Sequence, residues 1–585
     1  MWGSTYMSTK RMPVTVALAA ALVMASSVAA GAATSRNDTT DAPTAPAARA
    51  EASQGTHEYV VSFEGDAAAA EAAIEAAGGT VVDVTDEVGL ALVSAGDDAF
   101  VAEVQQDAAI TGVARNQSVG LQRPDMPHRY VEERPAASER AAAARAGAVG
   151  RRGGVTRGEP LADRQWDMAM IGATPTEAHR RATGRGVDVG IIDTGIDGSH
   201  PDLAPNFDAA RSRNFTQDIP TIDGPCEVAT CIDPANVDDG GHGTHVAGTV
   251  AAARNNFGIG GVAPDATLVN LRAGQDSGYF FMYETVAALV EAGNLGLDVV
   301  NMSFYTDPWL YNCASEDDYI SGAVTPEQIA EQALIRSTVL AALDYAHEAG
   351  VTLVAAAGNG FTNLAAPERF DDSSPDYPEG AATERVVTDN CLDLPSEGPD
   401  VISVSSVGPS TTKSDFSNYG LGDVEVAAPG GWFRDYVGTP AFSTPENMIL
   451  STYPLHVAIE EELVDENGVP LDEFSVQYCN RRGTCGVYTY LQGTSMASPH
   501  VAGVAALVIE EHGTRRRGQY SLDPDTVRSI IEETATDHAC PAGGVEIYTD
   551  EGRDASWNAV CEGTTDENGL YGEGIVNATA AVARR

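Results

Sequence analysis

The stretch VDVGIID, residues 187–193, decides the predicted fold. It is a short, β-branched and mostly apolar run, which is typical of a strand buried in a parallel sheet. Similar runs follow it and alternate with helical segments. The strand-like runs are TLVNLR (267–272), DVVNMS (298–303), TLVAAAGN (352–359) and VISVSSV (401–407); the helical segments include THVAGTVAAA (244–253), TVAALVEAG (285–293) and TVLAALDYAHEAG (338–350). From Trp166 onward this alternation predicts an α/β fold with a doubly wound, mainly parallel sheet.

The chain begins with a segment that is typical of export. Lys10 and Arg11 precede an apolar run that ends in the small residues 29–32, so we predict a signal peptide over 1–32 and a secreted product. A membrane anchor is the alternative, but the run is shorter than the roughly 20 residues that span a bilayer. Residues 33–55 are rich in Ala, Thr, Pro and Ser, which predicts a disordered lead-in.

Two further segments precede the large domain, which we place at 161–585. Residues 56–120 alternate strand and helix patterns, with strands at YVVSF (59–63), TVVDV (80–84) and GLALVSA (89–95). That order predicts a small α+β, ferredoxin-like domain. Residues 121–160 are rich in Arg, Ala, Pro and Gly and contain the pair Arg151-Arg152, so we interpret them as a cleavable linker.

Charge restricts the classes of partner. The formal net charge is -49 and the pI is about 4.3, and Lys10 and Lys413 are the only lysines. A nucleic acid would be repelled by this charge, so we exclude it as a partner. An acidic, solvated surface explains the composition better than a specific cationic partner does.

The eight cysteines indicate disulfide bonds, since the chain is expected to reach an oxidising compartment. Cys226 and Cys231, and Cys479 and Cys485, are close enough in sequence to close small loops, Cys540 and Cys561 bracket a Gly-containing stretch, and Cys313 and Cys391 remain. A CxxC metal spacing is absent from the sequence, so zinc is a poor alternative.

Asp193 stands at the end of the first strand, in DTGID. Gly195 lets the chain turn away, which would leave the carboxylate in the crevice at the strand ends. DTG is also the signature of aspartic peptidases, which need a second carboxylate to share a proton. Asp276-Ser277-Gly278 is the only candidate for a second copy, and it does not follow an apolar strand directly.

His242 lies in GGHGTHVAG, residues 240–248, where the glycines allow close backbone approach and a buried helix begins. A histidine at such a place can act as a base. His242 and His245 could in principle bind zinc, but the Glu of HExxH is missing. We expect His245 to be a hydrogen-bonded core residue.

Ser495 lies in GTSMASPHVAGVAALV, residues 493–508, at a Gly-led turn that enters a helix. A helix N-cap is the simplest role for an isolated serine here. A serine nucleophile needs an imidazole to take its proton and a carboxylate to orient that imidazole. The chain order Asp193, His242, Ser495 is one of the known orders of that triad.

The segments VDVGIIDTGIDGSHPDL, GHGTHVAGTVAA and GTSMASPHVAGVAAL resemble the three signature blocks of the subtilases, the subtilisin-like serine peptidases. The resemblance extends from Trp166 to YGEGIVNATAAV near the C-terminus, and residues 58–119 are similar to the inhibitory propeptide of that family. It implies that Asp193 orients the imidazole, that His242 is general base and then acid, and that Ser495 is the acyl-forming nucleophile.

The resemblance also implies the residues around the triad. Asn359, at the end of VAAAGN, would stabilise the oxyanion together with the backbone N–H of Ser495. An extended substrate would pair with two edges, formed by Asp276, Ser277 and Gly278 and by Ser303, Phe304 and Tyr305. Relatives commonly have glycine where Tyr305 stands, so the specificity pocket is expected to differ here.

A structural calcium ion is the remaining element that the resemblance implies; no catalytic cofactor is expected. Asp202 and Asn255, the latter in ARNNFGIGGVAP, are the side-chain candidates, and an ordinary turn is the alternative. Three stretches exceed a minimal subtilase, 307–331, 360–398 and 431–490. The first two contain Cys313 and Cys391, which makes a bridge between them a natural hypothesis.

The sequence thus predicts a secreted, monomeric endopeptidase of broad range that acts on proteins or peptides. Its own N-terminal domain would inhibit it until that domain is cut away. A processing peptidase with one protein substrate is the first alternative. The second is a binding protein on an inactive scaffold, which would normally have lost a catalytic residue.

Overall fold

The computed structural model describes residues 57–96, 99–116, 158–377, 380–515 and 520–584. The predicted signal peptide, the lead-in and nearly all of the predicted linker lie outside these ranges.

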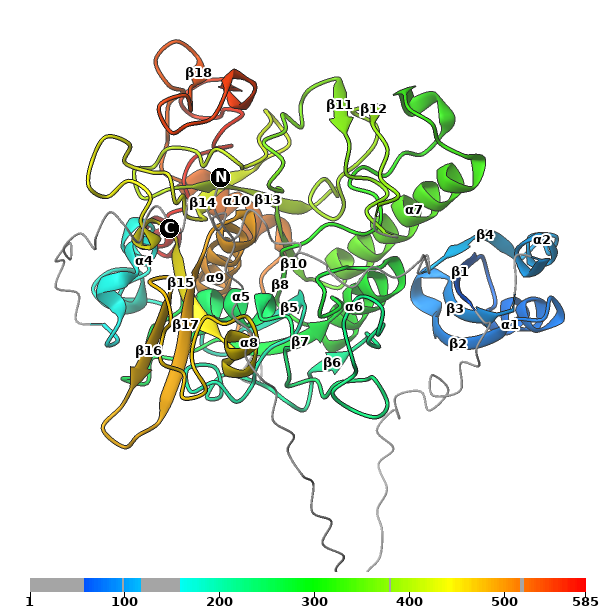
Figure 1. The fold of residues 1–585 in the computed structure, drawn as a ribbon, viewed down its shortest axis with the longest axis horizontal. Coiled ribbons are helices and arrows are strands. Elements are labelled where there is room, and N and C mark those ends of the chain that lie inside the picture. Colours follow the sequence, from blue (N-terminus) through cyan, green and yellow to red (C-terminus); the bar gives the residue numbers. More distant parts are fainter. Residues whose placement is uncertain (1–56, 97–98, 117–157, 378–379, 516–519, 585) are drawn as a thin grey trace, which may run out of the picture. The chain divides into compact units, whose positions relative to one another are not determined.

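A seven-stranded parallel sheet forms the centre of the large domain (Figure 1). In order of pairing its strands are β14 (Val426–Pro429), β13 (Val401–Val407), β10 (Thr352–Ala356), β8 (Val299–Met302), β5 (Asp188–Asp193), β7 (Thr267–Arg272) and β6 (Arg213–Asn214). Gly190 of β5 pairs with Val269 on one side and with Val300 on the other, both in parallel register. The predicted α/β, doubly wound fold is confirmed.

Helices cover both faces of this sheet. One hydrophobic cluster joins Val189 of β5 to α5 (His242–Ala251), α9 (Thr494–His512), α10 (Pro524–Thr534) and α11 (Ala578–Ala583). A second cluster joins Ile192 of β5 to α6 (Met282–Leu295) and α7 (Pro326–Glu348). Because side chains alternate along a strand, one strand supplies both cores.

Residues 57–116 form a separate four-stranded antiparallel sheet in the order β2-β3-β1-β4. Its elements are β1 (His57–Phe63), α1 (Ala67–Ala76), β2 (Thr80–Thr85), β3 (Leu90–Ala95), α2 (Ala99–Val104) and β4 (Ile110–Arg115). This βαββαβ order is ferredoxin-like, as predicted.

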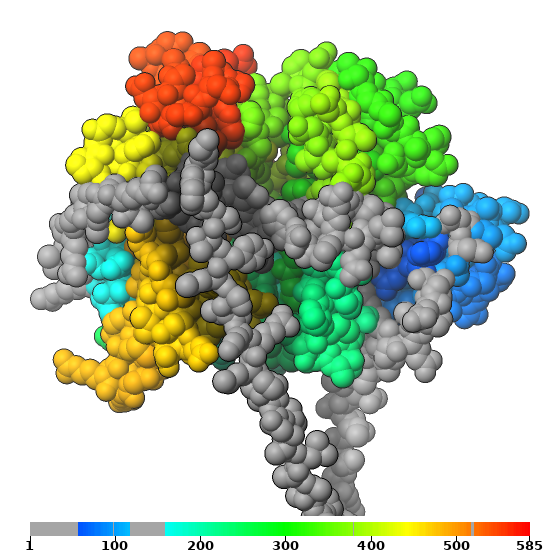
Figure 2. Space-filling model, in the orientation of Figure 1, coloured from blue at the N-terminus to red at the C-terminus, as the bar shows by residue number. Residues whose placement is uncertain are grey.

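The predicted insertions carry two small sheets. Strands from the first two insertions pair in one sheet, ordered β11 (Glu368–Asp371), β12 (Arg385–Thr388) and β9 (Tyr319–Ser321). The third insertion provides β15 (Ile449–Tyr453), α8 (Leu455–Glu460) and β16 (Ser475–Cys479), and both strands pair with β17 (Cys485–Leu491). The turn between β16 and β17 projects from the body in Figure 2. The remaining short elements are α4 (Trp166–Met170), β18 (Val545–Glu546) and β19 (Ala559–Val560).

All four predicted disulfides form: Cys226–Cys231, Cys313–Cys391, Cys479–Cys485 and Cys540–Cys561. Cys313 lies in the first insertion and Cys391 in the second, so their bridge links the two insertions covalently. Both cysteines are fully buried. Among the described residues, none of the helices combines the length and the apolar character needed to cross a bilayer.

Candidate active site

Asp193 and His242 form a buried hydrogen-bonded pair. Asp193 ends β5, His242 begins α5, and the His242 Nδ1 lies 2.7 Å from Asp193 Oδ1. The same oxygen accepts the backbone N–H of Thr194. Burial raises the pKa of Asp193, while His242 and the Thr194 N–H lower it. A carboxylate in this position orients the imidazole and stabilises its protonated form.

Asp238 organises the start of α5, and sequence reasoning missed it. It is fully buried, and its carboxylate accepts hydrogen bonds from the Thr194 hydroxyl (2.9 Å), the Gly241 N–H (2.8 Å), and the N–H (2.9 Å) and hydroxyl (2.5 Å) of Thr244. Thr194 adjoins Asp193, and Gly241 precedes His242. Asp238 therefore connects the two segments that carry the Asp-His pair. An acid shortly before a Gly-initiated helix was the available signal.

Ser495 is the second residue of α9, where the backbone N–H groups of the first turn have no intrahelical partner. Its Oγ donates to the Ser303 carbonyl at 3.3 Å, and the Ser303 hydroxyl lies 3.1 Å from the Ser495 carbonyl. Gly493, with φ 158°, precedes the helix as the predicted Gly-led turn requires. Ser303 therefore fixes both the backbone and the hydroxyl of Ser495.

Asn359 presents an amide N–H group near Ser495. Its Oδ1 accepts both the backbone N–H and the hydroxyl of Thr494, each at 2.9 Å. A backbone N–H can only donate, so the amide oxygen must face Thr494 and the Nδ2 group is directed elsewhere. Asn359 and Ser495 line one cavity of about 280 Å³, where a preset donor suits a developing oxyanion.

All three residues of one predicted substrate edge and one residue of the other line the same cavity. Ser303, Phe304, Tyr305 and Gly278 line it. Phe304 stacks on Phe280 with ring centroids 4.1 Å apart, which gives the cavity an aromatic wall. The Tyr305 hydroxyl donates to Asp376 Oδ2 at 2.5 Å, so this side chain is held in place at the predicted substrate edge.

Asp276 faces an acidic group around Arg272, Ser277 donates to Asp223 Oδ1 at 2.7 Å, and neither residue lines the cavity. Arg272 is fully buried and binds Asp233 at 2.7 Å, Asp276 at 2.6 Å and Asp218 at 3.6 Å. With Glu227, these carboxylates place one oxygen each within 4.8 Å of one another. Asp276 is thus bonded to Arg272, which leaves no carboxylate dyad with Asp193. The sequence assigned Asp276 to a substrate edge and gave no sign of this group.

This group predicts a pH dependence of stability. Burial raises the pKa of Asp218 to about 7 and that of Asp276 to about 8, so the folded chain keeps protons that the unfolded chain loses near pH 4. The free energy of unfolding should therefore fall as pH rises from about 4 to about 8. Asp218→Asn should make that fall smaller in calorimetry on a Ser495→Ala background, which prevents autolysis. The exposed Asp525→Asn is the control, and an unchanged slope in Asp218→Asn would contradict the assignment.

Asp202 and Asn255, the predicted calcium ligands, lie together. Asn255 Nδ2 donates to Asp202 Oδ1 at 3.2 Å, while Tyr488 OH (2.7 Å) and Ile259 N–H (3.0 Å) donate to Oδ2. Burial raises the pKa of Asp202 to about 7. Asn255 Oδ1 and Glu159 Oε2 are buried without a hydrogen-bond partner. An amide oxygen and two carboxylates are ligands of the kind that Ca²⁺ prefers, and Glu159, whose charge acts on Asp202, was missed from sequence.

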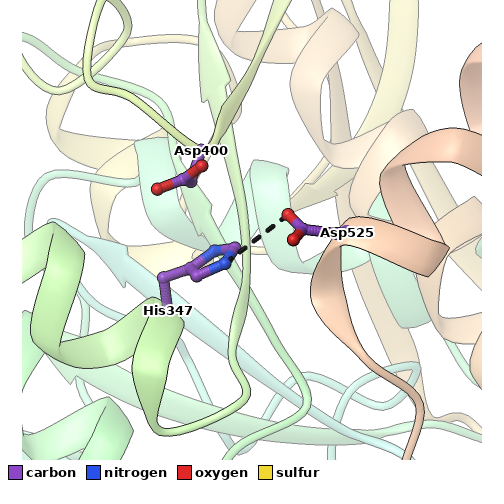
Figure 3. A group of neighbouring side chains, drawn as sticks. All are labelled: His347, Asp400 and Asp525. Atoms are coloured by element: carbon purple, nitrogen blue, oxygen red, sulfur yellow. Dashed lines mark ion pairs between the residues drawn. The ribbon is translucent and has the colours of Figure 1, made fainter.

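A third acidic group, His347, Asp400 and Asp525, converges at the junction of α7 and α10 (Figure 3). His347 Nε2 lies 3.6 Å from Asp525 Oδ1, and the Asp525 side chain is 72% exposed. His347 is in the last turn of α7 and Asp525 in the first turn of α10, so each side chain complements its own helix dipole. Helix-end electrostatics accounts for the pair.

Comparison with known proteins identifies the class. The model of the subtilase family, Peptidase_S8, matches residues 184–563. The chain therefore belongs to the subtilase family of serine-type peptidases.

Among curated relatives, fervidolysin of Fervidobacterium pennivorans is 29% identical over 65% of this chain and 41% of its own length. Subtilisin DY of Bacillus licheniformis is 30% identical over 60% of this chain and 85% of its own length. Among solved structures, the epidermin leader peptide processing serine protease of Staphylococcus aureus aligns with a TM-score of 0.58 at 20% identity, covering 91% of this chain and 99% of that one. This last likeness shows the fold.

Proposed function

We propose that this chain is a secreted serine endopeptidase made as a self-inhibited precursor, with Asp193, His242 and Ser495 as its triad. The observation that carries the proposal is the buried Asp193–His242 hydrogen bond of 2.7 Å, in a chain whose Ser495 and Asn359 line one cavity. Asp193 holds the imidazole, and His242 takes the Ser495 proton and returns it to the leaving amine. Ser495 Oγ forms the acyl bond.

Asn359 would stabilise the tetrahedral intermediate. Thr494 holds its Oδ1, which leaves Nδ2 as a donor beside Ser495, and the Ser495 backbone N–H is the second donor. The substrate, a protein or peptide, would pair as an extended strand with the edges at Asp276–Gly278 and Ser303–Tyr305.

Contacts between residues 57–116 and α6 support the inhibitory role of this small domain. Asn116 is buried, its Nδ2 lies 3.2 Å from Glu284 Oε2, and its Oδ1 accepts the Tyr283 N–H at 3.1 Å. Tyr283 and Glu284 lie in the first turn of α6, only a few residues after Gly278 of the predicted substrate edge. The C-terminal end of the small domain at Asn116 therefore lies beside the start of α6, which supports a position of this domain near the cleft.

The proposal also includes secretion of the chain and a structural calcium ion. Four disulfides and the predicted signal peptide over 1–32 support secretion. A calcium ion held by Asp202, Asn255 and Glu159 would neutralise two carboxylates and fix the loop after α5. No catalytic cofactor is proposed, and the enzyme is proposed to be monomeric.

A dedicated processing peptidase is the second candidate, because the inserted segments 307–331 and 360–398 contribute Asp307, Leu310, Ser373 and Asp393 to the cavity wall. Efficient cleavage of unfolded casein at many sites would contradict a single dedicated substrate.

The zymogen proposal is tested by the masses of wild type and of Ser495→Ala secreted from the same host. We expect the wild type to lack the region before about Trp166 and the alanine variant to keep it. Ser495→Cys, which retains a nucleophile, is the matched variant and should mature slowly. Equal trimming of wild type and Ser495→Ala would assign maturation to another peptidase.

A further inference from the structure

Asp393 is a buried carboxylate without a hydrogen-bond donor, in the same cavity as Ser495 and Asn359. Its residue is 3% exposed, and it lines the cavity of about 280 Å³. Its Oδ2 lies 3.4 Å from the point that a side-chain Cβ on Gly358, the neighbour of Asn359, would occupy. Among the described residues, Asp393 uses its backbone N–H and carbonyl in hydrogen bonds with Glu397 and Ser396, while no group donates to its side chain.

The cations nearby are already paired. Arg369 binds Glu397 through two bonds of 2.6 and 2.7 Å and also donates to the carbonyls of Leu364 and Cys391. Arg385 pairs with Asp371 at 2.6 Å. Asp393 is thus a carboxylate with which neither arginine forms an ion pair. Burial, and next the charge of Glu397, raise its pKa well above the usual range, as expected for a buried acid without a partner.

The first two insertions hold Asp393 in place. The Cys313–Cys391 bridge lies two residues before it, and its backbone N–H donates to Glu397 at 2.7 Å. The lining that Asp393 shares with Ser495 also includes the apolar side chains of Phe280, Phe304, Leu310 and Ala356. A cavity that combines these apolar groups with an unpaired carboxylate fits a side chain with an aliphatic stem and a cationic head.

We propose that Asp393 selects arginine or lysine as the substrate residue on the acyl side of the cleaved bond. This inference rests on the proposed serine peptidase function and names the substrate class of that site. The side chain of the bound residue enters the cavity beside Ser495, its methylenes contact the aromatic wall, and its charge pairs with Asp393. Arginine can form two parallel hydrogen bonds to the carboxylate, so it is favoured over lysine. The predicted linker offers such residues at Arg151-Arg152.

The test compares matured wild type, Asp393→Asn and Asp218→Asn on fluorogenic peptides that differ only in the acyl-side residue: Arg, Lys, Leu or Phe. For wild type we expect kcat/KM for the Arg peptide to exceed that for the Leu peptide about 10²-fold or more. Asp393→Asn should lower that ratio at least 10²-fold. The reason is that kcat/KM for the Arg peptide falls, while kcat/KM for the Leu peptide changes only a few-fold. Asp218→Asn removes a buried carboxylate outside the cavity and should keep the wild-type ratio.

A wild type that cleaves Leu or Phe peptides as well as Arg would overturn the inference and leave the peptidase proposal intact. An unchanged ratio in Asp393→Asn would overturn it too. Failure of the matured wild type to cleave any peptide would overturn the peptidase proposal and the specificity with it. If Asp393→Asn does not fold, the inference is tested on the wild type with two peptide aldehyde inhibitors that differ only in their last residue, arginine or leucine. Tighter inhibition by the argininal than by the leucinal supports the inference, and equal inhibition overturns it.

Discussion

Replacing Ser495 by alanine is expected to lower kcat for peptide hydrolysis about 10⁶-fold, the loss that follows removal of the triad serine in subtilisin. Ser495 Oγ is the atom that would bond to the acyl carbon, and a methyl group cannot replace it. The change deletes one oxygen that donates a single 3.3 Å hydrogen bond, so the free energy of unfolding should change little between chains of equal length. Because the alanine variant is expected to keep the region before about Trp166, that region is removed with an added peptidase before both proteins are compared by calorimetry and by kinetic assays with a fluorogenic peptide.

Asn359→Ala is expected to lower activity less than Ser495→Ala does. It keeps the nucleophile and base but removes the Nδ2 donor, so kcat should fall about 10²- to 10³-fold with KM nearly unchanged. Thr494→Val, which removes one of the two donors that orient Asn359, should lose less. A loss confined to KM would assign Asn359 to ground-state binding.

Asp238→Ala is expected to lower the free energy of unfolding by about 3 kcal/mol or more and to reduce kcat. The change leaves the Thr194 hydroxyl and the Gly241 and Thr244 N–H groups buried without an acceptor, and each such donor costs about 1–3 kcal/mol. The start of α5 would then be free to shift, and His242 with it. Urea unfolding and peptide assays measure both effects.

The neighbouring Asp239→Ala is the matched control, since its carboxylate pairs at 2.7 Å with His456, a half-exposed side chain. Such pairs contribute about 1 kcal/mol or less. If Asp238→Ala is too unstable to purify, Asp238→Asn keeps one acceptor oxygen and should show the same defects to a smaller extent. Equal stability of the Asp238 and Asp239 variants would contradict the role given to Asp238.

The sheet was predictable because its signal is local. Each strand is a buried β-branched run, and the side-chain alternation that divides Val189 and Ile192 between two cores is a property of any extended chain. The triad candidates were found for a related reason, since Asp193 ends a strand while His242 and Ser495 stand at glycine-led helix starts. Spacing suggested the short-range disulfides but left their connectivity open, and the structure pairs Cys226 with Cys231, Cys479 with Cys485 and Cys540 with Cys561.

Asp393 and the acidic group around Arg272 could not be predicted, because their properties come from distant parts of the chain. Asp393 matters only because Arg369 and Arg385 are already paired and because an insertion places it in the cavity that Asn359 also lines. No short segment of the sequence shows which of these charged groups pair with one another in the folded chain. The position of Asp276 in the chain indicated a substrate edge. Its side chain instead pairs with Arg272, four residues earlier, whose other partners, Asp218 and Asp233, come from a distant part of the chain.

The Cys313–Cys391 bridge makes the proposed substrate selectivity depend on the oxidation of two thiols. Within the proposed function, the triad stands on the parallel sheet and its helices, which hydrophobic packing can assemble before any thiol is oxidised. The wall that holds Asp393 gains its covalent tie only when this bridge closes, which requires an oxidising compartment. A chain with this bridge reduced would therefore keep the elements that carry the triad, while the wall of the proposed specificity site would lose its covalent tie.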